Sequence, residues 1–438
     1  MSKHREEVNP GGSSYTESEI SKIFTQEEVI EKYQLPAIGL GLIIHSIKQE
    51  ISVSGVRKIG NGAKVSAEDK WHIGSCTKSM TATLAAVIIG SGKYPSLTWE
   101  TKLKDVFDFN IHPDFRNVTL PEILAHRSGI MDPTDEEFLY LFGKDFESLF
   151  CGQYQEQSSD SIQLGRLIIA EKFLSIGSKY DPSMIKEYQY SNLGYVIAGT
   201  ILEKITGQSW EQLMLDNIFI PLEMYSAGFG PPAQSALENP DQPWGHHKQD
   251  EQSSLLIPSN KDLQALMGPA GLVHCSIPDL LKYTSVHIDG FNGLDTKILS
   301  ASEFKILHED RYNLEYTPGG WMLIKEEGLG LTLEHEGSNG LNEAAIVIAP
   351  ELKSAIIVVM NCYNEEVIQV MCEAGAKRIK SMDKIFEEAN QSPIQESLMQ
   401  QYDSGDSSNI DQTMVLDKLH QILESKHSET LESFHQDF

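Results

Sequence analysis

Long apolar runs are absent from this sequence. No stretch of its 438 residues approaches the roughly 20 apolar residues that a membrane-spanning helix needs. The first residues, Met1 to Glu7, are mostly polar and charged and lack the hydrophobic core of a secretion signal. We therefore expect a protein that has no membrane partner and that resides in the cytoplasm.

Basic residues are also scarce. The sequence has 35 lysines and arginines against 63 aspartates and glutamates, which gives a net charge of −28. Nucleic acid and anionic lipid surfaces repel such an acidic chain, so neither is expected as a partner. The excess of acidic charge favours solubility instead.

Cysteine is rare as well. There are five cysteines, an odd number, and their spacing fits neither a disulfide framework nor a metal site. The pair His246-His247 lacks a third ligand at metal spacing, so it predicts a surface loop rather than a metal centre. We expect no metal and no cofactor.

Hydrophobic and turn patterns divide the chain into four parts. Residues 1–16 are polar and predict disorder. Residues 17–110 together with 315–385 predict an α/β lobe, in which strands from both chain segments form one antiparallel sheet. Residues 111–314 predict a mostly helical lobe, and residues 386–438 an acidic extension with a short amphipathic helix. Strands are expected at 38–44, 51–59, 320–325, 331–335, 343–348 and 355–360.

The segment from Ile73 to Ala82 carries the strongest chemical signal. Ser75 and Lys78 lie at i and i+3 at the start of a predicted apolar helix, so they share one helix face. The positive end of the helix dipole favours an alkoxide and disfavours a nearby cation, which helps serine act as a nucleophile and lysine as a neutral base. On this signal alone, Ser75 could equally be a helix N-cap. The same spacing recurs at Ser183–Lys186, Ser302–Lys305 and Ser381–Lys384.

Two further segments follow in an informative order. Tyr190 and Asn192 form the only Y-x-N pattern in the sequence, in a predicted loop before a helix that ends near Gly207. His335 and Gly337 follow a predicted strand and precede an Asn-Gly pair. A serine–lysine pair, a tyrosine-x-asparagine turn and a basic-x-glycine strand, in this order, are the pattern of the penicillin-recognising serine hydrolases.

The chain resembles the class C branch of the β-lactamase-related superfamily, which includes D-aminopeptidases, β-lactamase-like esterases and LACTB-type proteins. The resemblance runs from about Leu35 to Lys380. It includes segments similar to the family's L-x-x-H-T-S-G-L, I-F-x-P-L-G-M and P-A-G-G-L, at 124–130, 218–224 and 269–273. The resemblance implies an α/β (α+β) fold of the β-lactamase/transpeptidase type, with an antiparallel sheet flanked by helices and an inserted, mostly helical lobe.

The resemblance also implies catalytic roles for three residues. Ser75 would be the nucleophile that forms an acyl-enzyme. Lys78 would be a base whose pKa falls from about 10.4 because of burial and the helix N-terminus. Tyr190 would be the partner base and later the acid to the leaving group, which requires that its pKa of about 10 fall too or that its proton be shuttled.

Four positions are implied to bind the substrate: Asn192, His335, Gly337 and Ser338. Asn192 would also hold the lysine and hydrogen-bond the substrate amide. Gly337 would let the edge strand approach the substrate closely. The backbone N–H groups of Ser338 and of the nucleophile would form the oxyanion hole.

His335 departs from the pattern, because β-lactamases and transpeptidases carry lysine there. Histidine is mostly neutral at pH 7 and supplies no permanent charge for a substrate carboxylate. We therefore predict a serine hydrolase, esterase or peptidase-like, that acts on a small-molecule or peptide-like ester or amide. Two alternatives stay open: a β-lactamase or penicillin-binding protein, and a catalytically inactive binding or scaffold protein. Homo-oligomers occur among such relatives and are possible here.

Overall fold

The computed structural model describes residues 26–142, 157–179, 186–233, 240–250, 255–311 and 316–390. These residues belong to two compact units, one that ends at Ala374 and one that begins at Gly375. The predicted disorder of residues 1–16 and the predicted amphipathic helix beyond residue 410 lie outside the described residues. The four-part division of the chain stays a prediction.

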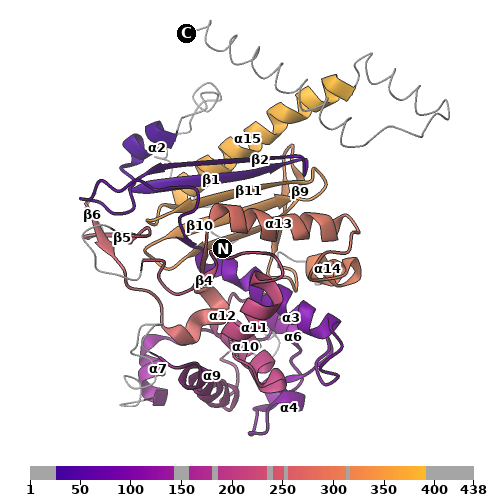
Figure 1. Ribbon diagram of the computed structural model, residues 1–438. Helices are drawn as coiled ribbons and strands as arrows, with labels where there is room; N and C mark the ends of the chain where they lie inside the picture. The colour runs from indigo at the N-terminus through magenta and orange to yellow at the C-terminus, as the bar shows by residue number, and fades with distance from the viewer. Residues whose placement is uncertain are drawn as a thin grey trace, which may run out of the picture. The chain divides into compact units, whose positions relative to one another are not determined.

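A six-stranded antiparallel sheet organises the first unit (Figure 1). Its order is β2-β1-β11-β10-β9-β8, so the N-terminal hairpin lies beside strands from the C-terminal part of the chain. This confirms the predicted sheet. The strands are β1 Ala37–Ile44, β2 Lys48–Gly55, β8 Met322–Glu326, β9 Gly330–Ser338, β10 Glu343–Ala349 and β11 Ser354–Met360.

Burial in this sheet follows the position of each strand. The central strands β10 and β11 are buried along their whole length and consist almost entirely of alanine, valine and isoleucine. The edge strand β2 carries polar residues such as Lys48 and Glu50 and is buried nowhere along its length. Continuous apolar runs therefore form the covered centre, and the polar edge opposes pairing with further strands.

Glycines let helix α13, Ile277–Phe291, lie close against β1. A Cβ atom added at Gly39 would lie 2.7 Å from the Ile277 side chain, and one at Gly41 would also meet Ile277. Larger residues at either position would push the helix away from the sheet. The missing side chains therefore set the distance between these two layers.

Helices form the rest of the unit, around the central helix α3, Thr77–Gly90. This helix contacts α10, Asn192–Thr206, and α12, Gly268–Gly271. The other helices of the unit are α2 Gln26–Tyr33, α4 Leu103–Val106, α5 Pro113–Arg116, α6 Leu120–Leu124, α7 Asp135–Phe142, α9 Ser159–Leu174, α11 Trp210–Met214 and α14 Ala301–His308, with short helical segments η1 Gly74–Cys76, η4 Leu215–Phe219 and η5 Ala265–Met267. Helix α15, Glu365–Asn390, begins in the first unit and continues into the second.

Two small sheets complete the unit. In the first, β7 Val273–Cys275 lies between β3 Trp71–His72 and β4 Gly228–Phe229. In the second, β5 Gly245–Lys248 pairs with β6 Leu256–Ser259. The first sheet delivers the chain from Trp71 into the turn that carries Ser75.

The predicted surface loop at His246-His247 is wrong for His246. This residue is buried in β5, its Nε2 accepts a hydrogen bond from the backbone N–H of Ile59 at 3.1 Å, and its Nδ1 lies 2.9 Å from the carbonyl oxygen of Asn361. Both ring nitrogens are therefore used to join segments that are distant in sequence. His247, the next residue, is exposed.

Candidate active site

Ser75 lies in a tight turn between β3 and α3. Gly74 has a φ of 50°, a left-handed conformation that glycine adopts without strain, and its N–H donates to His72 Nδ1 at 3.1 Å. The N-caps of η1 and α3 are Ile73 and Cys76, so Ser75 caps neither helix. The side chain of Ser75 is therefore not explained by helix capping.

The Lys78 side chain is fully buried, and its amine contacts three oxygens. These are Ser75 Oγ at 2.9 Å, Asn192 Oδ1 at 2.7 Å and the carbonyl oxygen of Ala270 at 2.7 Å. Burial lowers the pKa of this amine from its ordinary value to about 7, against an opposing attraction from Asp132. A large share of the amine is therefore unprotonated at neutral pH.

The three contacts fix the direction of the lone pair on that amine. An unprotonated amine has two hydrogens and one lone pair, and Asn192 Oδ1 and the Ala270 carbonyl oxygen can only accept. These two oxygens take both hydrogens, so the lone pair faces Ser75 Oγ. In this unprotonated form the Ser75 hydroxyl can donate to Lys78, whereas the protonated ammonium donates to Ser75 Oγ.

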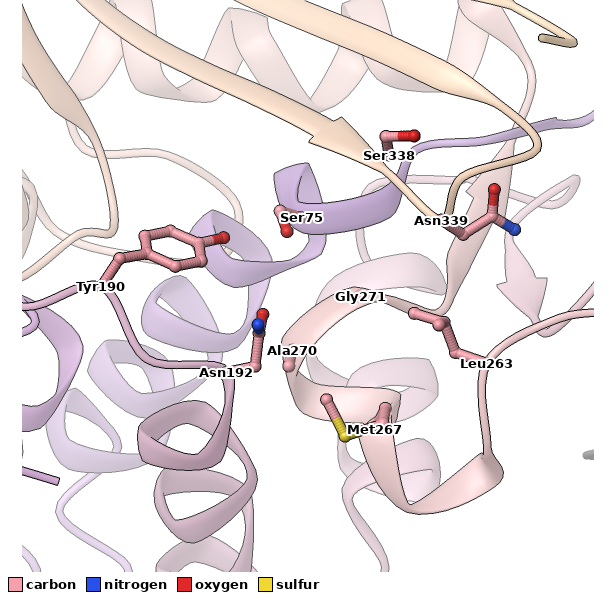
Figure 2. Close-up of a pocket in the computed structure, with 9 residues that line it drawn as sticks. All are labelled: Ser75, Tyr190, Asn192, Leu263, Met267, Ala270, Gly271, Ser338 and Asn339. Carbon is pink, nitrogen blue, oxygen red and sulfur yellow. The ribbon is translucent and has the colours of Figure 1, made fainter. Parts of the chain in front are cut away.

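Tyr190 lies beside this pair, and Figure 2 shows its hydroxyl directed toward Ser75. The Lys78 amine is 4.9 Å from the centre of the Tyr190 ring. Burial of the hydroxyl raises the pKa of Tyr190 above its ordinary value, and a hydrogen bond with Ser75 opposes that rise without cancelling it. Of the two predicted alternatives, a fall in the pKa is therefore wrong and a shuttled proton stays a prediction: the phenol is protonated at neutral pH.

The segment that resembles L-x-x-H-T-S-G-L holds the Tyr190 turn in place. His126 accepts hydrogen bonds from the N–H of Gln189 at its carbonyl oxygen, at 2.8 Å, and from the N–H of Ser191 at Nδ1, at 3.0 Å. Its ring stacks on Tyr190 with a centroid distance of 4.4 Å. Burial lowers the pKa of His126 well below its ordinary range, so the ring is neutral and can accept at Nδ1. His126 thus supports the turn.

Two glycines bring strand β9 against the Ser75 turn. A Cβ atom at Gly337 would lie 2.5 Å from the backbone nitrogen of Ser75, and one at Gly74 would lie 2.6 Å from the carbonyl carbon of Gly337. Such distances are shorter than any real contact, so both positions require glycine. The contact places the backbone of Ser338 next to that of Ser75, the two residues predicted to form an oxyanion hole.

His335 lies behind this region rather than in the pocket. It is 1% exposed, its Nδ1 lies 2.7 Å from the carbonyl oxygen of Glu336, and its ring meets Tyr316 edge-on. Burial and the nearby Lys78 lower the pKa of His335 to about 3, so the ring is neutral. A direct contact between His335 and a substrate would require movement of the side chain, and this role stays a prediction.

A pocket of about 230 Å³ opens beside Ser75 (Figure 2). Every lining residue is neutral, and part of the wall is apolar. The lining residues are Ser75, Tyr190, Asn192, Leu263, Met267, Ala270, Gly271, Ser338 and Asn339. The pocket therefore presents hydroxyl and amide groups but no fixed positive charge. Of the predicted substrate-binding residues, Asn192 and Ser338 line it, whereas His335 and Gly337 do not.

Sequence reasoning missed Asp132, which lies next to the predicted site. Its carboxylate accepts hydrogen bonds from Asn192 Nδ2 at 2.8 Å, from the N–H of Leu193 at 2.7 Å and from Ser191 Oγ at 3.3 Å. Its one signal in the sequence is its place two residues after the segment 124–130. Nothing in that spacing indicates contact with a helix 60 residues away.

A buried arginine fixes one wall of the pocket. Arg166 is fully buried and bonds to Glu203 at 2.7 Å and Glu211 at 2.5 Å. It also donates to the carbonyl oxygens of Ala265 and Leu266, at 3.0 Å and 3.1 Å. These two residues begin the segment that leads to the lining residues Met267, Ala270 and Gly271. The ion pairs of Arg166 therefore hold this wall of the pocket in place.

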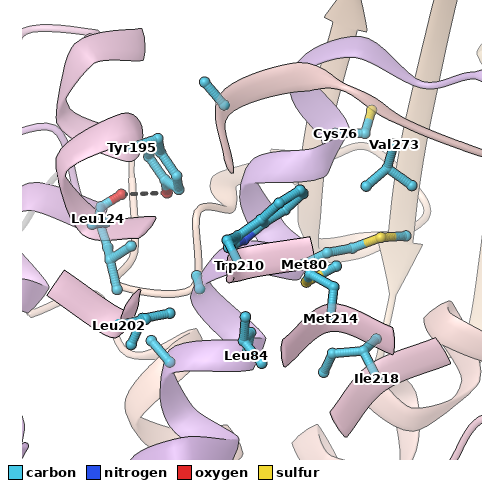
Figure 3. Packing of buried hydrophobic residues seen from close by; sticks show 14 of the residues in the cluster. Cys76, Met80, Leu84, Leu124, Tyr195, Leu202, Trp210, Met214, Ile218 and Val273 are labelled. Carbon is cyan, nitrogen blue, oxygen red and sulfur yellow. Dashed lines mark hydrogen bonds between the residues drawn. The ribbon is translucent and has the colours of Figure 1, made fainter. Parts of the chain in front are cut away.

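Apolar packing holds α3 from the other side. Figure 3 shows Met80 and Leu84 of α3 packed among apolar side chains that include Trp210 and Met214. The hydroxyl of Tyr195, on α10, donates to the carbonyl oxygen of Leu124 at 2.7 Å. The helix that carries Lys78 is thus held within a rigid core, which favours a fixed position for the amine.

Across the described ranges, no three histidine, cysteine, aspartate or glutamate side chains gather where they could hold a metal ion. Within the same part of the chain, no helix combines the length and the apolar character needed to span a bilayer.

A buried lysine bonded to a serine at the start of a helix, beside strand β9 of an antiparallel sheet, is the arrangement expected from the pattern of the penicillin-recognising serine hydrolases. Residues 26–371 match the Beta-lactamase family, and the chain belongs to that family. This confirms the predicted family and fold class.

The relatives are distant. Penicillin-binding protein 4 of Amycolatopsis lactamdurans is 24% identical over 331 residues, which cover 73% of this chain and 79% of that protein. The octameric penicillin-binding protein homologue from Pyrococcus abyssi matches with a TM-score of 0.61 and 21% identity, over 82% of this chain and 76% of that one. The D-amino acid amidase from Ochrobactrum anthropi SV3 matches with a TM-score of 0.61 and 18% identity, over 85% of this chain and 99% of that one.

Proposed function

We propose that this protein hydrolyses esters or amides through an acyl-enzyme on Ser75, and that its substrates carry a neutral acyl group. The observation that carries the proposal is the 2.9 Å contact between Lys78 Nζ and Ser75 Oγ, made by a buried amine whose pKa is about 7. A serine hydroxyl needs a base to become nucleophilic, and this amine is a base in the required place.

The proposed acylation uses both neighbours of the serine. Lys78 takes the proton of Ser75 as Oγ attacks the substrate carbonyl carbon. The backbone N–H groups of Ser75 and Ser338 stabilise the oxyanion, a contribution of about 10²–10³ in rate for one such donor. When the tetrahedral intermediate collapses, the leaving group departs with the proton of the Tyr190 hydroxyl, which leaves a phenolate beside the Lys78 ammonium.

Deacylation restores both groups. The Tyr190 phenolate takes a proton from water, and the resulting hydroxide attacks the acyl carbon. Ser75 Oγ then leaves and recovers its proton from the Lys78 ammonium. The raised pKa agrees with a phenol that begins and ends each cycle protonated, and the Lys78 ammonium beside it stabilises the phenolate in between.

The pocket supports a neutral acyl group. Its lining residues carry no positive charge, and the buried His335 is neutral. A substrate carboxylate would lose its hydration without gaining a cationic partner, which is costly. This favours esters and amides over β-lactams and other substrates with a carboxylate next to the reacting group. Leu263 and Met267 favour a small apolar acyl side chain.

Labelling by a fluorophosphonate tests the proposal. Full-length wild-type protein is expected to react, and Ser75→Ala is expected not to. Absence of labelling in folded wild-type protein would instead support the inactive scaffold.

The kcat/KM for a p-nitrophenyl ester of a short acid is expected to exceed that for a chromogenic cephalosporin, with a D-alanyl anilide measured in parallel. The reverse ranking of ester and cephalosporin would support a β-lactamase.

The pH dependence of the ester reaction is a separate prediction. Only the unprotonated Lys78 amine can take the serine proton, so kcat/KM is expected to rise with pH and level off, with a midpoint near the amine pKa of about 7. Measurements between about pH 5 and pH 9 cover this transition. A rate that falls as the pH rises through 7 would contradict the role of Lys78 as the base.

A further inference from the structure

Asp132 connects the loop after α6 to the start of α10. Its Oδ1 accepts from the N–H of Leu193 at 2.7 Å and from Ser191 Oγ at 3.3 Å. Its Oδ2 accepts from Asn192 Nδ2 at 2.8 Å. The carboxylate thus bonds three successive residues, and the middle one also contacts the amine of Lys78.

We propose that Asp132 is a positioning residue: it fixes the orientation of the Asn192 amide and, through it, the protonation of Lys78. The proposal rests on the proposed function, in which Lys78 is the base. Asp132 does not line the pocket and is not assigned contact with the substrate.

The donors and acceptors around Asn192 determine the orientation of its side-chain amide. Asn192 presents Oδ1 to the Lys78 amine and Nδ2 to the Asp132 carboxylate. Rotating the amide by half a turn would place the NH₂ group against the amine and the oxygen against the carboxylate. The oxygen would repel the carboxylate, and the NH₂ group would either repel an ammonium or occupy the lone pair that a neutral amine directs to Ser75. Asp132 therefore keeps an acceptor aimed at Lys78, and this acceptor helps to direct the amine lone pair to Ser75.

The charge of Asp132 acts in the same place. Burial favours the neutral amine, and the carboxylate opposes it, so the pKa settles at about 7 instead of falling further. The other titratable groups that act electrostatically on Lys78 or contact its amine are Cys76, His126, Tyr190, Tyr195 and His335. Burial raises the pKa values of the thiol and both phenols and lowers those of both imidazoles, so all five are neutral at pH 7. Asp132 is then the negative charge that raises the pKa of Lys78 and so favours its protonated form.

The substitution Asp132→Asn tests both effects. The new side-chain amide would keep an oxygen for Leu193 but turn an NH₂ group toward Asn192, so the Asn192 amide would lose its fixed orientation. The Lys78 pKa is expected to fall by on the order of one unit. The kcat for an ester is expected to fall about 10-fold or more, because the lysine is less well directed and less basic.

The direct readout is the titration of Lys78 by NMR in protein labelled with [ε-¹³C]lysine, with the Lys78 signal assigned from Lys78→Arg. Asp132→Asn and Asp132→Ser are both expected to lower the midpoint, so the test stands if one of them fails to fold. Asp132→Glu keeps the charge and is expected to titrate near the wild type. Asp279→Asn is the matched control: Asp279 is a carboxylate that also joins segments distant in sequence, since it accepts from the N–H of Ser226 at 2.8 Å.

A lower midpoint in the two neutral variants, with Asp132→Glu and Asp279→Asn near the wild type, would support the proposal. An unchanged midpoint in a folded neutral variant would overturn it, as would an equal shift in Asp279→Asn. The titration needs no turnover, so it can be read even if the wild type fails to react with a fluorophosphonate. That failure would count against the hydrolase function and not against the role of Asp132.

Discussion

Replacement of Lys78 by arginine is expected to lower kcat/KM for the ester by about 10³-fold or more. A guanidinium stays protonated at any accessible pH, so it cannot take the proton of Ser75. Fluorophosphonate labelling of Ser75 is expected to slow in parallel, because the same proton must leave. Steady-state kinetics and labelling rates measure the two effects, and a thermal melt shows whether the variant is folded.

A matched control and a rescue sharpen this test. Lys204 forms a surface ion pair with Asp108 at 2.9 Å, and Lys204→Arg keeps that pair, so this variant is expected to match the wild type. Lys78→Ala leaves a cavity that a small primary amine can enter. Added ethylamine is expected to restore part of its activity but none of that of Lys78→Arg. If folded Lys78→Arg reacted at the wild-type rate, Lys78 would not be the base that takes the Ser75 proton.

The largest loss of stability is expected from Arg166→Met. The substitution leaves the buried carboxylates of Glu203 and Glu211 without their cation, and breaking a buried ion pair in this way costs about 3–5 kcal/mol. Loss of the bonds to Ala265 and Leu266 is expected to loosen the pocket wall, so KM should rise as well. Denaturant unfolding and ester kinetics measure these effects.

Two controls separate charge from side-chain volume. Arg311 pairs with Glu309 on the surface at 3.4 Å, so Arg311→Met is expected to change the free energy of unfolding by less than about 1 kcal/mol. Adding Glu203→Gln and Glu211→Gln to Arg166→Met removes the unpaired charges and is expected to recover part of the loss. If the triple variant is no more stable than the single variant, the loss arises from packing and not from charge.

Local geometry explains which parts of the site could be predicted from the sequence. Ser75 and Lys78 are one helical turn apart, so their contact follows from helix geometry alone. Tyr190 and Asn192 lie more than 100 residues away, and their position was predicted only through the family resemblance. The centre of the sheet was predictable because β10 and β11 are continuous apolar runs between turn residues, and both are buried throughout.

Long-range packing explains the rest. His335 occupies a motif position that indicates substrate contact, yet it is buried beside Tyr316. The pKa of Tyr190 rises because burial outweighs the bond to Ser75, a balance that no sequence pattern reports. Asp132 belongs to no predicted motif, since its role depends on how the loop after α6 meets the start of α10.

The most direct test of the account is to identify the group that becomes acylated. Wild-type protein is mixed with the p-nitrophenyl ester, quenched with acid during turnover, digested and examined by mass spectrometry. The account predicts that the peptide containing Ser75 gains the mass of the acyl group and that longer incubation without ester removes it. Turnover with no adduct on that peptide, or with the adduct on a different residue, would contradict the account.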